Sequence, residues 1–253
     1  MSGLQGTETS GAVAAIATAL GKLTVHDVSP VLSGDLPMWF MYEPPVVNPI
    51  VRHDQGGAAV NTLAMCEHTG THVDAPFHFH GPGATMAEVP VDSLLLRRFC
   101  KYDLTANDHQ PGELIGLEHL KAAEAKGGFS VQPGDVAIIE VGWDRYLPDG
   151  SDAKEPTWWG RNQPGLSEEA CEYLADLGPV AVASDTAACD VAAVDAEMLG
   201  AHGHVHAFLP RGILIVEGLH GLAAVPSTGL FLALPLKIAD GTGSPLRVVL
   251  LTE

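Results

Sequence analysis

Apolar residues in this chain occur in short blocks that are separated by Gly, Pro and small polar residues. Short apolar blocks bounded by turn residues are typical of buried strands. We therefore expect a first strand to run from Leu23 to the Ser-Pro pair at 29–30. Further strands are predicted within residues 133–143, 179–186, 212–219, 230–238 and 245–251.

One segment has the pattern of an amphipathic helix instead. Ser167 precedes two glutamates and is placed to cap the first turn, and Gly178 is placed to end the helix. Between them, apolar residues recur at helical spacing, as at Ala170 and Leu174. Because predicted strands outnumber predicted helices, the pattern indicates an α/β domain with a mixed sheet.

The N-terminal part has a different character. The Ala-rich run near the start predicts a short helix or a tail, so we assign residues 1–22 to an N-terminal extension and residues 23–253 to a single domain. Residues 37–49 are aromatic and interrupted by prolines, which predicts a loop that lines a pocket. Within this loop, Trp39 and Phe40 are candidates for stacking on a planar substrate, and simple core packing is the alternative.

Composition narrows the choice of partners and location. A chain of 253 residues that is 46% hydrophobic can bury a full core, and its formal net charge of -18 argues against nucleic acid as a partner. No apolar run is long enough for a membrane span. The four cysteines lie far apart without a CxxC spacing, which favours reduced thiols in a cytoplasmic protein.

The strongest chemical signal lies between Cys66 and Gly83, in the sequence CEHTGTHVDAPFHFHGPG. On a strand, His72 and Asp74 would be about 6.6 Å apart on one face, so both could reach one metal ion. His68 could join them only if the chain bends at Gly70. Imidazole and carboxylate ligands favour Zn, Mn or Fe over Ca or Mg.

Three other residues are assigned around this core. His78 is the candidate general acid and base, with a role as a further ligand as the alternative. Glu217 lies in a predicted buried strand, where ligation of a metal or a salt bridge to Arg211 would offset the cost of burial. His206, in the sequence HGHVH, is our choice as its companion, although His202 and His204 remain open.

These motifs resemble the cyclase-like metal-dependent hydrolases, a family that includes kynurenine formamidases and isatin hydrolases. The segment HTGTHVDAPFHF is similar to the family signature HxGTHxDxPxHF, and weaker similarities follow in the family's order up to the C-terminal segment. The resemblance implies a swivelling β/β/α fold, His68, His72 and Asp74 as metal ligands and His78 as catalytic histidine. It also implies Mn or Zn as the cofactor, a second ion held in part by Glu217 in formamidases, and a homodimer or homotetramer.

The predicted activity is hydrolysis of a carbon-nitrogen bond in a small aromatic amide by a metal-activated water. The substrate would be a cyclic amide such as isatin or an N-formyl aryl amine such as N-formylkynurenine, and the aromatic loop at 37–49 favours the cyclic amide slightly. A metal-dependent esterase or lactonase would need the same groups. A non-haem iron oxygenase, with two histidines and one carboxylate as ligands, is the alternative from another reaction class.

Overall fold

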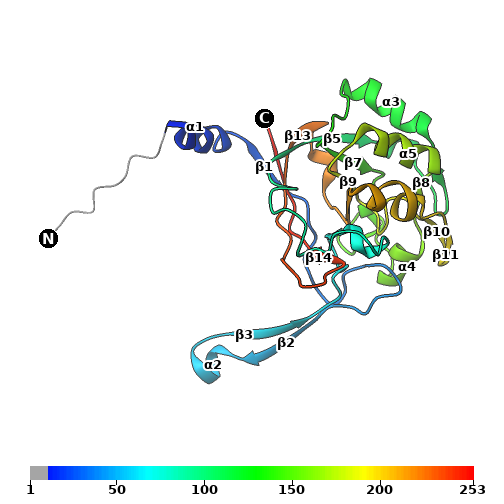
Figure 1. The fold of residues 1–253 in the computed structure, drawn as a ribbon. Coiled ribbons are helices and arrows are strands. Elements are labelled where there is room, and N and C mark those ends of the chain that lie inside the picture. Colours follow the sequence, from blue (N-terminus) through cyan, green and yellow to red (C-terminus); the bar gives the residue numbers. More distant parts are fainter. Residues whose placement is uncertain (1–10) are drawn as a thin grey trace.

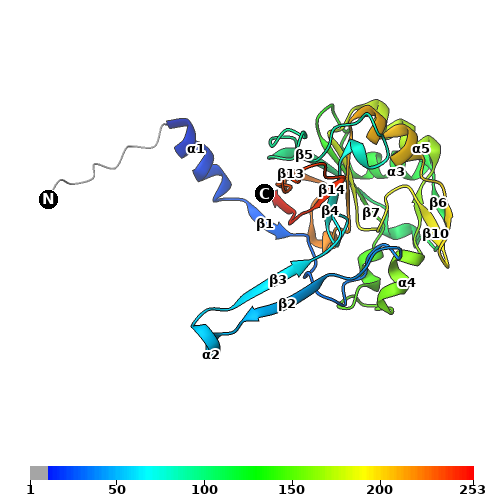
Figure 2. The ribbon, with the colours of Figure 1, turned by 60° about the horizontal axis from the view of Figure 1, so that its bottom comes forward.

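The structure is a computed structural model and describes residues 11–253 (Figure 1). It consists of a rounded body of sheet and helices from which the N-terminal helix and a long β-hairpin project (Figures 1 and 2). Part of the extension predicted for residues 1–22 lies outside the described residues. Within the described part of that extension, α1 (Gly11–Leu20) is a helix with no buried residue.

One large mixed sheet forms the centre of the body, as the sequence pattern predicts. In the described residues it has nine strands in the order β1 (Thr24–Asp27), β15 (Val249–Thr252), β13 (Thr228–Leu232), β5 (Arg97–Asp103), β7 (Val136–Glu140), β9 (Ala181–Ser184), β12 (Leu214–Glu217), β4 (His72–Asp74) and β14 (Gly243–Pro245). The four strands from β5 to β12 are parallel, and the strands on both sides of them pair antiparallel. The α/β prediction with a mixed sheet is therefore confirmed.

Side chains of the central strands alternate between two cores, one on each face of the sheet. On β7, Ala137 and Ile139 pack into the core on the helix side, whereas Val136 and Ile138 pack into the core on the opposite face. The helix-side core also contains the large buried ring of Trp143. Strands that are buried on both faces explain why their sequences form continuous apolar blocks.

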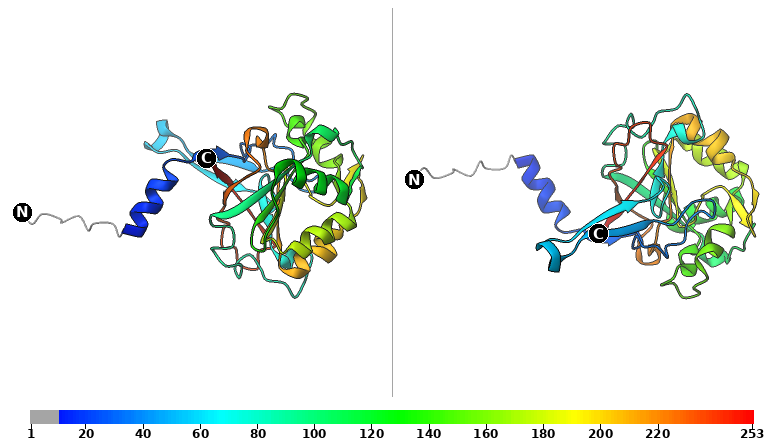
Figure 3. Two further views of the ribbon diagram at one scale, coloured as in Figure 1. Left: turned by 90° about the horizontal axis from the view of Figure 1, so that it is seen from above. Right: turned by 90° about the horizontal axis from the view of Figure 1, so that it is seen from below.

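Three of the described helices lie against one face of the sheet (Figure 3). They are α3 (Leu117–Gly127), α4 (Pro156–Arg161) and α5 (Glu168–Leu177), and α2 (His53–Gly56) is a single turn at the tip of the hairpin. The predicted helix is confirmed in α5, where the Ser167 hydroxyl accepts a hydrogen bond from the Ala170 amide and Gly178 ends the helix with a φ of 70°.

The loop predicted for residues 37–49 is wrong at its C-terminal end. There the chain enters β2 (Val46–Val51), which pairs with β3 (Val60–Ala64) to form the projecting hairpin. Pro49 is tolerated because the ladder is irregular between Pro49 and Val51. All residues of both strands are exposed except Val51, which is partly buried, so this hairpin does not follow the burial pattern of the strands in the body.

Three other differences from the prediction concern boundaries and short elements. The strand expected at 230–238 ends at Leu232, before Pro235, and the segment at 245–251 divides between β14 and β15. Two further pairs of short strands lie outside the main sheet, β6 (Leu114–Ile115) with β8 (Gly165–Leu166), and β10 (Ala192–Val194) with β11 (Glu197–Leu199). In the part of the chain that the structure describes, no helix is long and apolar enough to cross a bilayer.

Candidate metal centre

The centre forms where β4 and β12 lie side by side. Their antiparallel pairing sets Glu217 opposite His72 and Ile215 opposite Asp74. Val73 packs into the core on the far face of the sheet, so its neighbours on β4 must project toward the helix side. The two strands therefore present an imidazole and two carboxylates on one face, all within the buried interior.

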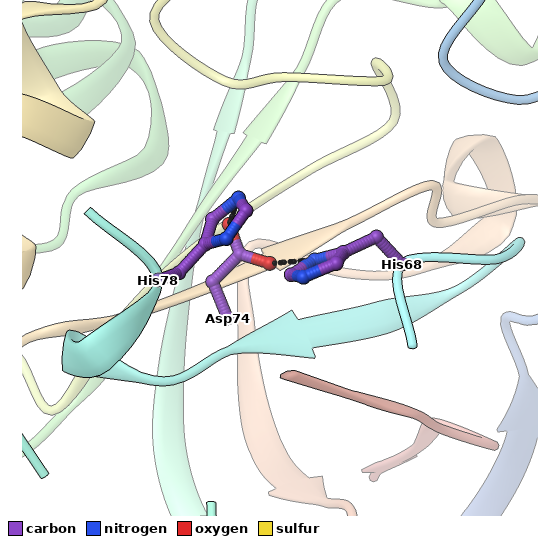
Figure 4. Close-up of side chains that lie close together, drawn as sticks. All are labelled: His68, Asp74 and His78. Atoms are coloured by element: carbon purple, nitrogen blue, oxygen red, sulfur yellow. Dashed lines mark hydrogen bonds and ion pairs between the residues drawn. The ribbon is translucent and has the colours of Figure 1, made fainter. Parts of the chain in front are cut away.

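The bend expected before β4 occurs at Gly70, whose φ is +63°. It brings His68 back over the strand, so that His68 Nδ1 lies 2.7 Å from Asp74 Oδ1 (Figure 4). The bend packs against the end of β12, where a Cβ on Gly218 would lie 2.9 Å from the Gly70 carbonyl oxygen. The hydroxyl of Thr71 donates a hydrogen bond of 2.7 Å to the Gly218 carbonyl and ties the two segments together.

His78 reaches the same place from the other end of β4. After β4, the chain turns through a short 3-10 helix, Pro76–His78 (η1), and the His78 ring stacks on the His68 ring at a centroid distance of 4.0 Å (Figure 4). Its Nε2 lies 4.0 Å from Asp74 Oδ2. Burial lowers the pKa of His78 to about 4, so the ring is neutral near pH 7 and can accept a proton.

The fourth histidine around Asp74 is His204, and the structure does not bring His206, our choice from the sequence, to the cluster. His204 Nε2 lies 3.2 Å from Asp74 Oδ2 and 3.5 Å from Glu217 Oε1. His206 is exposed and packs its ring against that of His202. The sequence HGHVH forms a π-helical turn, Gly203–Ala207 (η4), and residues two apart in a helical turn point in opposite directions. Helical spacing applied to the sequence would have placed His202 and His206 on one side of the turn and His204 alone on the other.

Glu217 is held by the cluster and not by Arg211. Its Oε2 lies 3.4 Å from His72 Nε2, and its Oε1 accepts a hydrogen bond of 3.1 Å from the Cys189 amide. The Arg211 guanidinium instead pairs with Glu172 and Asp176 on α5. The salt bridge considered from the sequence therefore does not form.

Opposite charges dominate the electrostatics of this centre. Burial disfavours the charged forms, but the carboxylates of Asp74 and Glu217 outweigh it and raise the pKa of His72 to about 10. Asp190 and the same two carboxylates likewise hold the pKa of His204 well above its ordinary value, against the effect of burial. The pKa of Asp74 is held well below its usual range, again against burial, with His204 as the strongest partner. The carboxylates thus require positive charge beside them.

The donor set fits a divalent cation. Two groups of ligand atoms, each within 4.8 Å of one another, share Asp74: His68, Asp74 and His78, and His72, Asp74 and Glu217. Asp74 Oδ2 is buried, and none of the described residues gives it a hydrogen bond of acceptable geometry, although His204 Nε2 is close. A buried, unsatisfied carboxylate oxygen among imidazoles is the arrangement that a metal ion would satisfy.

The cluster lines a cavity of about 310 Å³, a size suited to a small molecule. Trp39 lines this cavity, whereas Phe40 is not among its lining residues and packs its ring against Trp39 at a centroid distance of 4.7 Å. Apolar lining residues that the sequence did not single out are Met41, Phe79, Val191 and Met198. Met41 lies in the loop that was predicted to line a pocket, and Phe79 directly follows His78, whereas Val191 and Met198 had no local signal.

Comparison with known proteins agrees with this geometry. A kynurenine formamidase of Paracidovorax citrulli (strain AAC00-1) is 32% identical over 232 residues, which cover 90% of this chain and 93% of the relative. An isatin hydrolase of Roseibium aggregatum is 29% identical, over 91% of this chain and 92% of the relative. The structure of isatin hydrolase A from Ralstonia solanacearum superposes with a TM-score of 0.82 at 25% identity, covering 99% of this chain and 100% of the other.

The family model described as putative cyclase matches residues 26–191, more than half of the chain. The matched range includes the bend at Gly70, β4 and the turn that carries His78. Together with the full-length relatives, this match shows that the chain belongs to the cyclase family of hydrolases.

Proposed function

We propose that this protein is a metal-dependent amidohydrolase that cleaves a carbon-nitrogen bond in a small aromatic amide. The observation that carries the proposal is the buried cluster of imidazoles and carboxylates around Asp74, which lines an apolar cavity. Kynurenine formamidase and isatin hydrolase, relatives of comparable length, are both named for amide substrates.

In this proposal the ion is Mn or Zn, held by His68, His72, Asp74, His204 and Glu217. Histidine and carboxylate ligands suit both metals. When bound, the ion would lower the pKa of a coordinated water and polarise the carbonyl of the substrate. The two groups of donors share Asp74, so this carboxylate would help to hold an ion at either group.

His78 is the proposed acid and base. Its ring is neutral near pH 7 and the side chain is partly exposed toward the cavity. It would take a proton from the attacking water and give it to the leaving nitrogen as the carbon-nitrogen bond breaks, which yields an amine and a carboxylic acid. Stacking on His68 and the proximity of Asp74 orient the ring for this exchange.

The lining of the cavity favours a flat, uncharged substrate. Trp39, Met41, Phe79 and Met198 supply apolar and aromatic surface, and the described lining contains no Lys or Arg that would hold a free carboxylate. A cyclic amide such as isatin fits this lining better than N-formylkynurenine, which carries an amino-acid group. An ester or lactone would fit the same surface and is the second candidate.

Anaerobic turnover tests the proposal directly. Chelator-treated protein restored with Zn or Mn is expected to hydrolyse at least one member of a panel of isatin, related imides, N-formylkynurenine and aryl esters. The substrate that is hydrolysed fastest would show whether cyclic amides, N-formyl aryl amines or esters are the preferred class. If no member of the panel is hydrolysed and activity appears only with iron and oxygen, the result would contradict the assignment as a hydrolase and support a non-haem iron oxygenase.

The two histidines of the π-helical turn provide a matched pair for the metal assignment. His204→Ala is expected to retain much less Zn or Mn after dialysis than wild type, because it removes a buried donor beside Asp74 and Glu217. His206→Ala, two residues away and exposed, is expected to retain the wild-type amount. Atomic emission measures the metal content of both variants. If His206→Ala were depleted of metal and His204→Ala were not, the assignment would be reversed.

For His78 we expect a separation of rate from metal content. His78→Ala should lower kcat by about 10² to 10⁴-fold, the usual contribution of a positioned acid or base, while metal content stays at the wild-type value. Steady-state kinetics and metal analysis on the same preparation check this. Loss of metal in parallel with the rate would make His78 a ligand, and unchanged turnover would remove it from the mechanism.

The projecting hairpin supports a homo-oligomer. Two-stranded hairpins are marginally stable alone in water, yet this one exposes a cross-strand apolar pair, Val47 opposite Leu63, with both side chains about half exposed, and Ile50 nearby at 61%. Its first strand begins four residues after Tyr42 and its second ends four residues before His68, and both of these residues line the cavity. We therefore propose that a second copy of the chain covers it in a homodimer or homotetramer.

Light scattering after size exclusion tests this arrangement. Wild type is expected to be a dimer or tetramer, and the double variant Val47→Asp with Leu63→Asp is expected to shift toward the monomer, because two charges would be buried without partners. Val91→Asp is the control, since Val91 is 74% exposed and lies outside the hairpin. A monomeric wild type, or an unchanged mass for the double variant, would contradict the proposal.

We also assign the protein to the cytoplasm. Cys66, Cys100, Cys171 and Cys189 are all free thiols. Reduced cysteines are the rule in a reducing compartment, whereas disulfides form in oxidising ones.

A further inference from the structure

Asp190 is a buried carboxylate that the proposed chemistry does not use. It follows β9 and is fully buried. Both of its oxygens are bonded to one residue, His204: Oδ1 lies 2.5 Å from the ring nitrogen Nδ1, and Oδ2 accepts the backbone amide at 2.8 Å. Among the described residues, no lysine or arginine forms an ion pair with it.

This double contact determines which nitrogen of His204 faces the cluster. A carboxylate can only accept, so the proton on Nδ1 is retained by its hydrogen bond to Asp190. The lone pair available to a cation is then on Nε2, the atom that lies 3.2 Å from Asp74 Oδ2 and 3.5 Å from Glu217 Oε1. Metal-ligating histidines are commonly held in this way by a carboxylate on the other ring nitrogen.

We propose that Asp190 is a positioning residue that fixes the ring orientation and the Nε2-ligating tautomer of His204, and thereby sets the metal affinity of the centre. The inference rests on the proposed metal role of His204 and adds to it a residue that does not touch the ion.

The backbone around Asp190 is built to hold this geometry. The amide of Cys189 donates to Glu217 Oε1 at 3.1 Å, so adjacent residues support both donors from the C-terminal half of the chain. Gln163, which is fully buried, anchors the same loop: its side-chain amide donates to the carbonyls of Ala188 and Val191 and accepts from the amide of Ala187. A loop tied at several points does not relax easily when one contact is removed.

Close packing beside His204 also supports the positioning role of Asp190. A Cβ on Gly203 would lie 2.8 Å from Asp190 Oδ2 and 2.5 Å from the Phe208 ring. Only glycine therefore lets the carboxylate reach both the backbone amide and the ring of the next residue. The geometry depends on a non-local contact between the loop after β9 and the π-helical turn.

The test is Asp190→Asn in the full-length protein. The amide has one acceptor where the carboxylate has two, so its NH₂ group must face either the His204 backbone amide or Nδ1. In the second case the proton moves to Nε2, which can then no longer bind a cation. We expect Zn affinity, measured by competition with a chromophoric chelator, to fall by about 10 to 100-fold.

A second readout separates positioning from general damage. Wild type should show a protected, downfield Nδ1 proton of His204 by NMR, assigned with His204→Gln. In Asp190→Asn this proton should be absent if the NH₂ group faces Nδ1, and shifted upfield if the amide oxygen, a weaker acceptor than a carboxylate, faces it. Asp185→Asn is the matched control, because Asp185 is equally buried and accepts two backbone amides, those of Val141 and Trp143, away from the cavity. It should destabilise the fold without changing Zn affinity or the His204 proton.

The outcomes are distinguishable. Wild-type affinity in Asp190→Asn, or an equal loss in Asp190→Asn and Asp185→Asn, would overturn the positioning role. Failure of wild type to bind Zn would overturn the proposed metal centre instead. In that case the Nδ1 proton, which does not require metal, still decides whether Asp190 holds the ring.

Discussion

The burial of carboxylates in one small volume is the constraint on which the rest of this structure depends. Asp74, Glu217 and Asp190 are at most 3% exposed and lie around the same histidine, His204. Uncompensated carboxylates would cost several kcal/mol each in such a place. The histidines, the backbone amides of the loop after β9 and, in the proposed function, a divalent ion are the positive groups that make this burial possible.

The sheet explains how the carboxylates come together. Alternation along β4 sends Val73 to the core and its neighbours His72 and Asp74 to the opposite face, and the pairing with β12 places Glu217 across from His72. The register of β4 and β12 is set by apolar residues packed on the far face of the sheet. The positions of His72, Asp74 and Glu217 therefore follow from ordinary core packing. A slip of one residue would turn the whole set away from the cavity.

Sequence reasoning succeeded where the determinants are local. The spacing of His68, His72 and Asp74 around Gly70 predicted a bend, and the bend occurs there with a positive φ. The fold class followed from apolar blocks that are buried on both faces. It failed for the β2–β3 hairpin, because that hairpin is exposed and has no alternating pattern of burial. It also failed to choose among the three histidines of HGHVH, because only the helical geometry of the π-turn separates the buried His204 from His202 and His206.

The two halves of the centre are therefore encoded differently. The N-terminal half is one continuous motif whose residues reach the buried cluster through a glycine bend and a proline turn, so it can be recognised from the sequence alone. The C-terminal half is assembled from β12, the π-helical turn and the loop after β9. No single stretch of the sequence contains all of its residues. Asp190 belongs to no recognisable motif, because its proposed positioning role depends on a contact with His204, 14 positions away. Tertiary structure is the level at which such a residue acquires a role.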